Sequence, residues 1–227
     1  MNPDAARRIL VRDLGLREYV PLWRAMQQFT DARDEHTDDE IWFTEHPPVF
    51  TMGLNASAEH LLAPGEIPVV QIDRGGQVTY HGPGQLMIYP LIDLKRAGLG
   101  VRTLVTALEQ SVVDFAKDLG ITAASRPDAP GVYVAGTKLA SVGLRIRRGA
   151  SFHGMALNID VDLEPFSRIN PCGFSQLQMT DLTRLGARAT LSDTWPQLLP
   201  HFLRHLGMQG AEIVRPGDEL PLTATGG

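Results

Sequence analysis

The chain carries a single cysteine, Cys172, in the stretch INPCGF at residues 169–174. Pro171 and Gly173 flank it, and such neighbours indicate a turn rather than the interior of a helix or strand. A lone cysteine is more often a buried, inert apolar residue than a reactive one. A thiol on a turn is exposed enough to attack a substrate, provided that a nearby base or cation favours the thiolate. Cys172 is therefore a candidate nucleophile.

Lys138 lies in the apolar run VAGTKLASVGL, at residues 134–144. In an alternating strand its side chain faces away from those of Thr137 and Leu139. The ordinary interpretation is a lysine that points to solvent from one side of a hairpin. The alternative is a desolvated lysine, in which burial favours the neutral amine and permits proton exchange near neutral pH. The pattern alone leaves both interpretations open.

The stretch RGGQVTYHGPGQL, residues 74–86, places four glycines and a proline between two expected strands. Glycine lets a ligand approach the backbone, and free N–H groups can hold a carbonyl oxygen or an anion. The order of residues matches neither the phosphate-binding P-loop nor the dinucleotide-binding G-x-G-x-x-G motif. A long decorated hairpin would have a similar composition, and His81 by itself would more often be structural than catalytic.

Evidence for a metal site is weak. His201 and His205 are four residues apart, so they share one face of a helix. No glutamate follows His201 as in the H-E-x-x-H motif, and the sequence has no other cluster of cysteine and histidine. We expect no metal and no cofactor.

The sequence as a whole indicates one large domain of mixed α and β structure. Its length fits one domain over residues 1–207, followed by a flexible tail over 208–227. A net charge of −5 argues against a general nucleic-acid binder. One cysteine excludes an internal disulfide, and we find no run of signal-peptide or membrane-span length, so we expect a cytoplasmic protein without membrane contact.

Periodicity predicts the elements that must position these groups. Helices are expected over 17–35, 101–120 and 192–207, the last capped by Ser192 or Asp193. Short buried strands are expected over 41–46, 67–72 and 85–94, where Pro90 suggests a sheet edge or a bend. Residues 131–159 alternate like a hairpin that turns at RRGAS.

Four blocks together closely resemble the lipoyl(octanoyl) transferase family: RGGQVTYHGPGQLMIYPLIDL, GVYVAGTKLASVGLRI, FHGMALNI and INPCGF. They run in the family's order from about Arg74 to Cys172, and the reactive positions show no departure from its pattern. The resemblance implies the α/β (α+β) fold of the biotin and lipoate protein ligase catalytic domains, a mixed sheet with helices packed against it.

The resemblance also implies an activity. The family transfers an octanoyl group from octanoyl-acyl carrier protein to a lysine of lipoyl domains, those of 2-oxoacid dehydrogenase E2 subunits and of glycine cleavage H protein. By family motif, Cys172 is the nucleophile that becomes acylated and Lys138 is its partner. The implied substrate-binding residues are Arg74, Gly75, Gly76, Gln77, Val78, Thr79, Tyr80, His81, Ser141, Val142, Gly143, Gly154, Met155 and Ala156.

Two alternatives stay open. The first is an ATP-dependent lipoate or biotin protein ligase of the same fold, which activates a free acid and needs no cysteine nucleophile. The second is a non-catalytic module that binds carrier proteins. Cys172 in its turn argues against the ligase, and the presence of both Cys172 and Lys138 argues against the non-catalytic module.

The turn of the expected hairpin is basic, with Arg145, Arg147 and Arg148 within four residues. An ordinary solvated turn explains these arginines. Acyl carrier proteins are acidic as a family, however, and this chain is itself negative, so a local basic patch would help the two proteins to associate. We therefore hypothesise that these arginines dock the donor.

Overall fold

The computed structural model describes residues 8–171, 177–215 and 220. Cys172 lies outside the described residues. Helices and short 3₁₀ turns span α1 (Tyr19–Ala32), η1 (Ala58–His60), α2 (Leu94–Ala97), α3 (Val101–Asp118), η2 (Glu164–Arg168) and α4 (Leu191–His205). Strands span β1 (Arg8–Leu16), β2 (Asp39–Glu45), β3 (Val49–Met52), β4 (Val69–Gln71), β5 (Val78–His81), β6 (Gln85–Leu91), β7 (Ala124–Ser125), β8 (Gly131–Val134), β9 (Thr137–Arg147), β10 (Ala150–Asn158) and β11 (Glu212–Val214).

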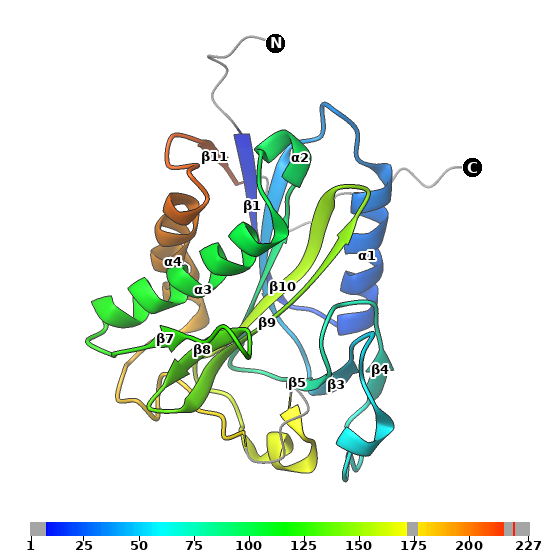
Figure 1. Ribbon diagram of the computed structural model, residues 1–227, viewed down its shortest axis with the longest axis vertical. Coiled ribbons are helices and arrows are strands. Elements are labelled where there is room, and N and C mark those ends of the chain that lie inside the picture. Colours follow the sequence, from blue (N-terminus) through cyan, green and yellow to red (C-terminus); the bar gives the residue numbers. More distant parts are fainter. Residues whose placement is uncertain (1–7, 172–176, 216–219, 221–227) are drawn as a thin grey trace.

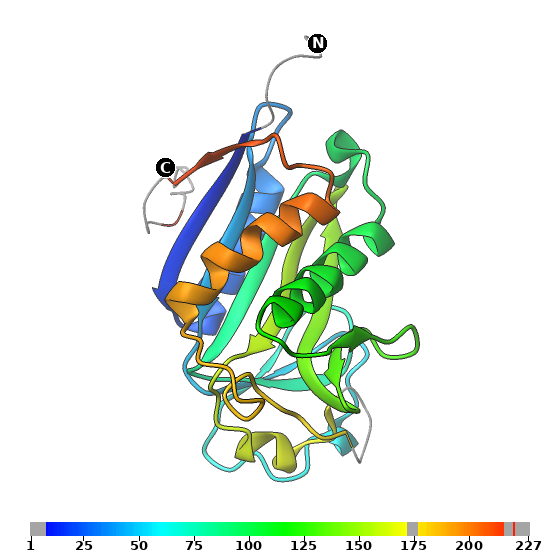
Figure 2. The same cartoon turned by 90° about the vertical axis from the view of Figure 1, so that its left-hand side faces the viewer.

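Among the described residues, eight strands form one mixed sheet in the order β11-β1-β2-β6-β10-β9-β8-β7. The strand β1 runs parallel to β2 and β11, and the remaining neighbours are antiparallel. A second sheet, in the order β4-β3-β5, lies below it in Figure 1. Helices α3 and α4 cover one face of the large sheet, and α1 covers the other (Figures 1 and 2).

Both faces of the large sheet are buried, and this explains the continuous apolar runs in its strands. In β2, Ile41 and Phe43 face the core under α3 and α4, whereas Trp42 faces the core under α1. In β6, Ile88 and Tyr89 divide in the same way. A strand covered on both sides needs apolar residues at every position rather than at alternate ones. The expected fold class, a mixed sheet with helices packed against it, is confirmed.

Two local expectations, the edge position of Pro90 and the cap of α4, were wrong. Pro90 lies in β6, a central strand, and not at an edge. It is tolerated there because the pairing of β6 with β10 ends at Ile88, so the missing N–H of Pro90 interrupts no ladder bond on that side. The cap of α4 is Thr190, whose hydroxyl accepts a bond from Asp193 N at 3.2 Å, rather than Ser192 or Asp193.

The C-terminal tail also differs from the expectation. Met208 is buried, and Glu212–Val214 forms β11, which pairs with β1 from Arg8 onwards. The flexible tail predicted from residue 208 therefore includes residues that extend the sheet. None of the helices in the described ranges is long and apolar enough to cross a bilayer.

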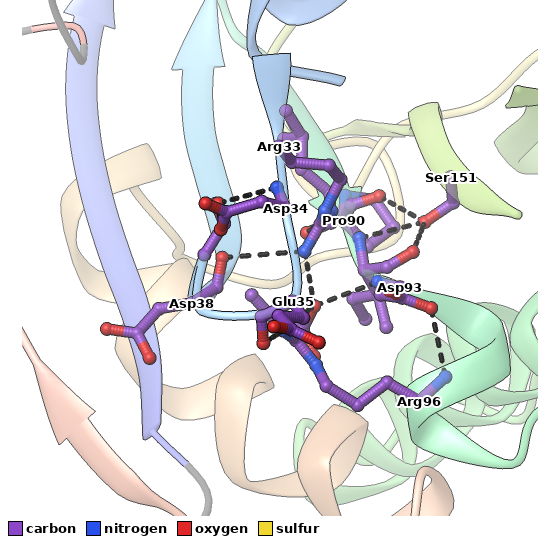
Figure 3. Close-up of polar contacts among 12 residues, drawn as sticks. Arg33, Asp34, Glu35, Asp38, Pro90, Asp93, Arg96 and Ser151 are labelled. Carbon is purple, nitrogen blue, oxygen red and sulfur yellow. Dashed lines mark hydrogen bonds and ion pairs between the residues drawn. The ribbon is translucent and has the colours of Figure 1, made fainter. Parts of the chain in front are cut away.

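A buried carboxylate at the start of β2 joins the sheet to two helices. Asp39 Oδ1 accepts bonds from Arg33 Nη2 at 2.7 Å, Arg96 Nη2 at 2.8 Å and Asp93 N at 2.8 Å. Figure 3 shows the side chains of Arg33 and Arg96 beside Asp93, with the bond from Ser151 to Pro90 nearby. Asp39 therefore holds the end of α1 and the start of α2 at the same point of the sheet.

We expect Asp39→Ala to lower the free energy of unfolding by about 3–5 kcal/mol, because it leaves buried guanidinium charge without its carboxylate. Urea unfolding followed by circular dichroism measures this. The matched control is Glu164→Ala, which removes an exposed pairing with Arg168 and should change stability far less. Equal shifts in the unfolding midpoint of the two variants would contradict the assignment.

Candidate active site

A cavity of about 490 Å³ lies between the β9–β10 hairpin, the loop before β5 and the start of α3. The hairpin that frames it is at the centre of Figure 1. This volume is in the range of small-molecule sites, ~300–1,000 Å³. A site of this size can enclose a medium-length apolar group.

Most of the predicted site residues surround this cavity. Those that line it are Arg74, Gly75, Gly76, Gln77, Val78, Thr79, His81, Lys138, Ser141, Val142, Gly143, Gly154, Met155 and Ala156. Tyr80 does not line it. Alternation along β5 turns Tyr80 to the opposite face from Thr79 and His81, where its ring packs 5.6 Å from Phe50 and 5.4 Å from Phe166.

Lys138 is almost fully buried, with 1% of its surface exposed, and it lines the cavity. The solvent-facing interpretation of this lysine is therefore wrong. Its Nζ lies 5.3 Å from the centre of the Tyr133 ring. The carboxylate of Glu109 lies close enough for charge interaction: burial raises the pKa of Glu109, and the bond from Gly131 N–H and the charge of Lys138 oppose that rise. Lys138 thus lies in apolar surroundings that also hold one acidic group.

The backbone N–H and the backbone C=O of Lys138 both bond to the segment that follows residue 176. Lys138 N donates to Gln178 O at 2.8 Å, and Thr180 N donates to Lys138 O at 2.9 Å. Residues 178–180 are therefore fixed against the strand that carries the buried lysine.

The glycine-rich loop packs directly on β9. Gly75 N donates to Leu144 O at 3.0 Å. A Cβ added at Gly143 would lie 3.1 Å from Arg74 Cδ and 3.2 Å from Gly75 O. A side chain at residue 143 would push the loop away, so the glycine of SVGL is required for this approach. Arg74 in turn donates to the backbone oxygen of Thr51 at 2.7 Å.

His81 has bonding partners at both ring nitrogens. Nδ1 lies 2.7 Å from Gln85 Oε1, and Nε2 lies 3.2 Å from Thr51 Oγ1. Burial lowers the pKa of His81 well below its usual value, so the ring is neutral. Both ring nitrogens of His81 therefore contact protein groups, although the ring borders the cavity.

His153 and Asp73 were missed by sequence reasoning. His153 lines the cavity at a positive φ of 57°, and its Nε2 lies 2.9 Å from Asp73 Oδ1. Asp73 also accepts bonds from Trp23 and Gln27 of α1. Burial opposes ionisation of Asp73, but these three bonds outweigh it and keep its pKa below the usual range. The sequence could have indicated these two residues only by their position, because Asp73 directly precedes Arg74 and His153 directly precedes Gly154.

The remaining candidates lie away from the cavity lining. Arg147 pairs with Asp31 at 2.9 Å, and Arg148 donates to the backbone oxygen of the same residue at 2.9 Å. Donor docking by the basic turn stays a prediction. His201 and His205 contact acidic residues of α3. Across the part of the chain that the structure describes, no group of three or more His, Cys, Asp or Glu side chains could hold a metal ion.

Comparison with known structures places the fold. A bi-partite lipoate protein ligase from Thermoplasma acidophilum superposes with a TM-score of 0.72 at 14% identity, covering 93% of this chain and 87% of that one. The biotin protein ligase from Aquifex aeolicus gives 0.53 at 11% identity, covering 89% and 70%. At these identities the likeness establishes the shared fold only.

Comparison of sequences is more specific. Residues 18–203 match the model of the lipoyl protein ligase A/B catalytic domain. An octanoyltransferase from Erwinia tasmaniensis is 56% identical over 224 residues, covering 99% of each chain. One from Xanthomonas campestris pv. campestris (strain B100) is 54% identical over 211 residues, covering 93% of this chain and 89% of the relative. The chain therefore belongs to the lipoyl protein ligase A/B catalytic domain family and, within it, to the octanoyltransferases.

Proposed function

We propose that this octanoyltransferase takes the octanoyl group from octanoyl-acyl carrier protein onto Cys172 and then passes it to a lysine of a lipoyl domain. The observation that carries the proposal is the buried Lys138 at a largely apolar cavity, on the strand that bonds to Gln178 and Thr180. Relatives at 54–56% identity that are octanoyltransferases support the same assignment.

In the first half-reaction, the Cys172 thiolate attacks the thioester carbonyl of the donor. A carbon–sulfur bond forms to Cys172, and the pantetheine thiolate leaves. Lys138 accepts the thiol proton and returns a proton to the leaving thiolate. One difficult transfer thereby becomes two easier ones.

In the second half-reaction, the acceptor lysine amine attacks the Cys172 thioester. Lys138 then accepts a proton from that amine, and the product is an amide. Because a thioester is already activated relative to an amide, the transfer needs no nucleotide. The oxyanion would be held by backbone N–H groups near Cys172 or in the glycine loop. Gly75 N already donates to Leu144 O, so the loop's contribution would come from its other residues.

The cavity suits the acyl chain. Apolar side chains from several elements line it, including Val101 and Val105 of α3, Met87 of β6 and Met155 of β10. Full burial of an octanoyl tail would contribute ~0.8 kcal/mol for each of its seven methylene or methyl groups, about 5–6 kcal/mol in total. This is enough to favour one range of chain lengths over shorter acyl groups.

The glycine at residue 131 makes room for Lys138. A Cβ added there would lie 2.5 Å from Lys138 Cε and 2.4 Å from Ala140 O, and the residue has a φ of +139°. Ordinary van der Waals contact needs about 3.5–4.0 Å between carbon atoms. Any side chain at position 131 would therefore displace the lysine from the cavity wall.

The first prediction concerns the acyl-enzyme. After mixing with octanoyl-acyl carrier protein, the intact mass should rise by one octanoyl group, and hydroxylamine should remove the adduct. Cys172→Ala should abolish the rise. ATP and magnesium should make no difference. An adduct that survives Cys172→Ala would exclude this mechanism, and use of free octanoate only with ATP would favour a ligase.

The second prediction concerns Lys138. Lys138→Ala should slow both half-reactions by ~10²–10⁴-fold, because it removes the group that moves protons. Lys138→Arg should not rescue them, because arginine stays protonated. Single-turnover acylation followed by mass measures the first step. The control Lys117→Ala changes an exposed lysine of α3 and should be neutral. Near-normal activity in Lys138→Arg would show that a positive charge at residue 138 is sufficient and that proton transfer by this residue is not needed.

The third prediction tests how Lys138 is held. Gly131→Ala should slow acylation by ~10–100-fold, because it displaces the lysine by the order of 1 Å. The matched control is Gly136→Ala in the same hairpin, which has a φ of +85° and open space around its Cβ. Both variants carry backbone strain, but only Gly131→Ala touches Lys138. If both variants acylate at the same rate, the position of Lys138 is not critical.

A further inference from the structure

A continuous line of buried hydrogen bonds joins the glycine loop to the interior of the large sheet. Arg74 Nη2 donates to Thr51 Oγ1 at 2.9 Å, and Thr51 Oγ1 lies 3.2 Å from His81 Nε2. His81 Nδ1 lies 2.7 Å from Gln85 Oε1, and Gln85 Nε2 donates to Asn158 Oδ1 at 2.9 Å. All five side chains are buried. The line therefore crosses from the cavity wall to the far end of β10.

The same line continues to Lys138. Asn158 Nδ2 donates to Thr180 O at 2.9 Å, and Thr180 N donates to Lys138 O at 2.9 Å. Two further backbone bonds hold this segment, from Leu182 N to Asn158 O and from Thr183 N to Ile159 O. The chain that follows residue 176 is thus fixed against β9 and β10 together.

The direction of each bond follows from the ends of the line together with the neutral His81 ring. A backbone carbonyl only accepts, so Asn158 Nδ2 and Gln85 Nε2 donate, and His81 must donate from Nδ1 to Gln85 Oε1. Burial lowers the pKa of His81 and keeps its ring neutral, so Nε2 accepts from the Thr51 hydroxyl, which itself accepts from Arg74. Gln85 and Asn158 each accept from one neighbour and donate to the next, and a carboxylate at either position would lack the donor.

Gln85 and Asn158 lie opposite each other, at the first residue of β6 and the last of β10. Neither one lines the cavity. We propose that Gln85 and Asn158 are positioning residues for the transfer reaction. They hold Thr180 and Leu182 next to the strand of Lys138. Through the line of hydrogen bonds, they also link this segment to the Arg74 loop. The inference rests on the proposed function, because it assigns these residues an effect on the reaction of Cys172 with Lys138.

The test is single-turnover acylation of Cys172 by octanoyl-acyl carrier protein, followed by intact mass. Asn158→Ala should lower the maximal rate ~10–100-fold, as expected for misplaced reacting groups, while the donor concentration for half-maximal rate changes less than ~3-fold. Asn158→Asp keeps the size of the side chain but puts an oxygen where Nδ2 donates. The same loss is expected from it, which covers the case in which Asn158→Ala folds poorly.

A double-mutant cycle separates positioning from general destabilisation. In the Lys138→Ala background, Asn158→Ala should slow acylation by less than ~3-fold, because the amide acts through the geometry around Lys138. A loss that merely reflects a weakened fold would be the same in both backgrounds and would overturn the proposal. The matched control is Ser151→Ala, which removes a buried bond to Pro90 O at the other end of β10 and should leave acylation unchanged.

The outcomes distinguish this proposal from the one on which it rests. If the wild-type protein forms no Cys172 adduct, the proposed function fails, and this inference fails with it. If the wild type acylates and the folded Asn158 variants acylate at the same rate, the proposed function stands and only the positioning assignment is overturned.

Discussion

The burial of one lysine amine is the constraint on which the site depends. Lys138 lies in a strand whose neighbours Leu139 and Ala140 are fully buried. Its side chain lines the cavity, lies beside the Tyr133 ring and interacts with the charge of Glu109. A charged amine in such a place is costly unless nearby groups compensate it, so the position of the amine must be closely controlled. Space for the side chain exists only because residue 131 is a glycine. The position of the amine is therefore set by this strand and by the glycine beside it.

The large sheet can hold this group because helices cover both of its faces. Helices α3 and α4 close one side and α1 the other, as Figure 2 shows, and Lys138 lies in the buried part of β9. The hairpin and the glycine loop both line the cavity, and Asp73 anchors that loop to α1 and to His153 of β10. The loop is thus positioned by polar bonds from several elements rather than by its own sequence. This explains how a glycine-rich segment can form one defined wall.

Much of the fold was predictable because its signals are local. The helices α1, α3 and α4 and the β9–β10 hairpin show clear periodicity, and their boundaries fell within a few residues of the expected ones. Strands β1 and β11 were missed, since β11 has only three residues and is stabilised by its partner rather than by its own pattern. The interior position of Pro90 could not be predicted, because it depends on where β10 parts from β6.

For the site, the sequence by itself determined the residue types that can do the chemistry: one thiol in a turn, one lysine in an apolar run and a glycine-rich loop. These follow from composition and order, which are properties of short segments. Only the tertiary structure decided that Lys138 is buried rather than solvent-facing, that Tyr80 faces away from the cavity and that Gln85, Asn158 and Thr180 form one line of bonds. Each of these depends on contacts between residues distant in the chain, and no local pattern encodes which strands become neighbours.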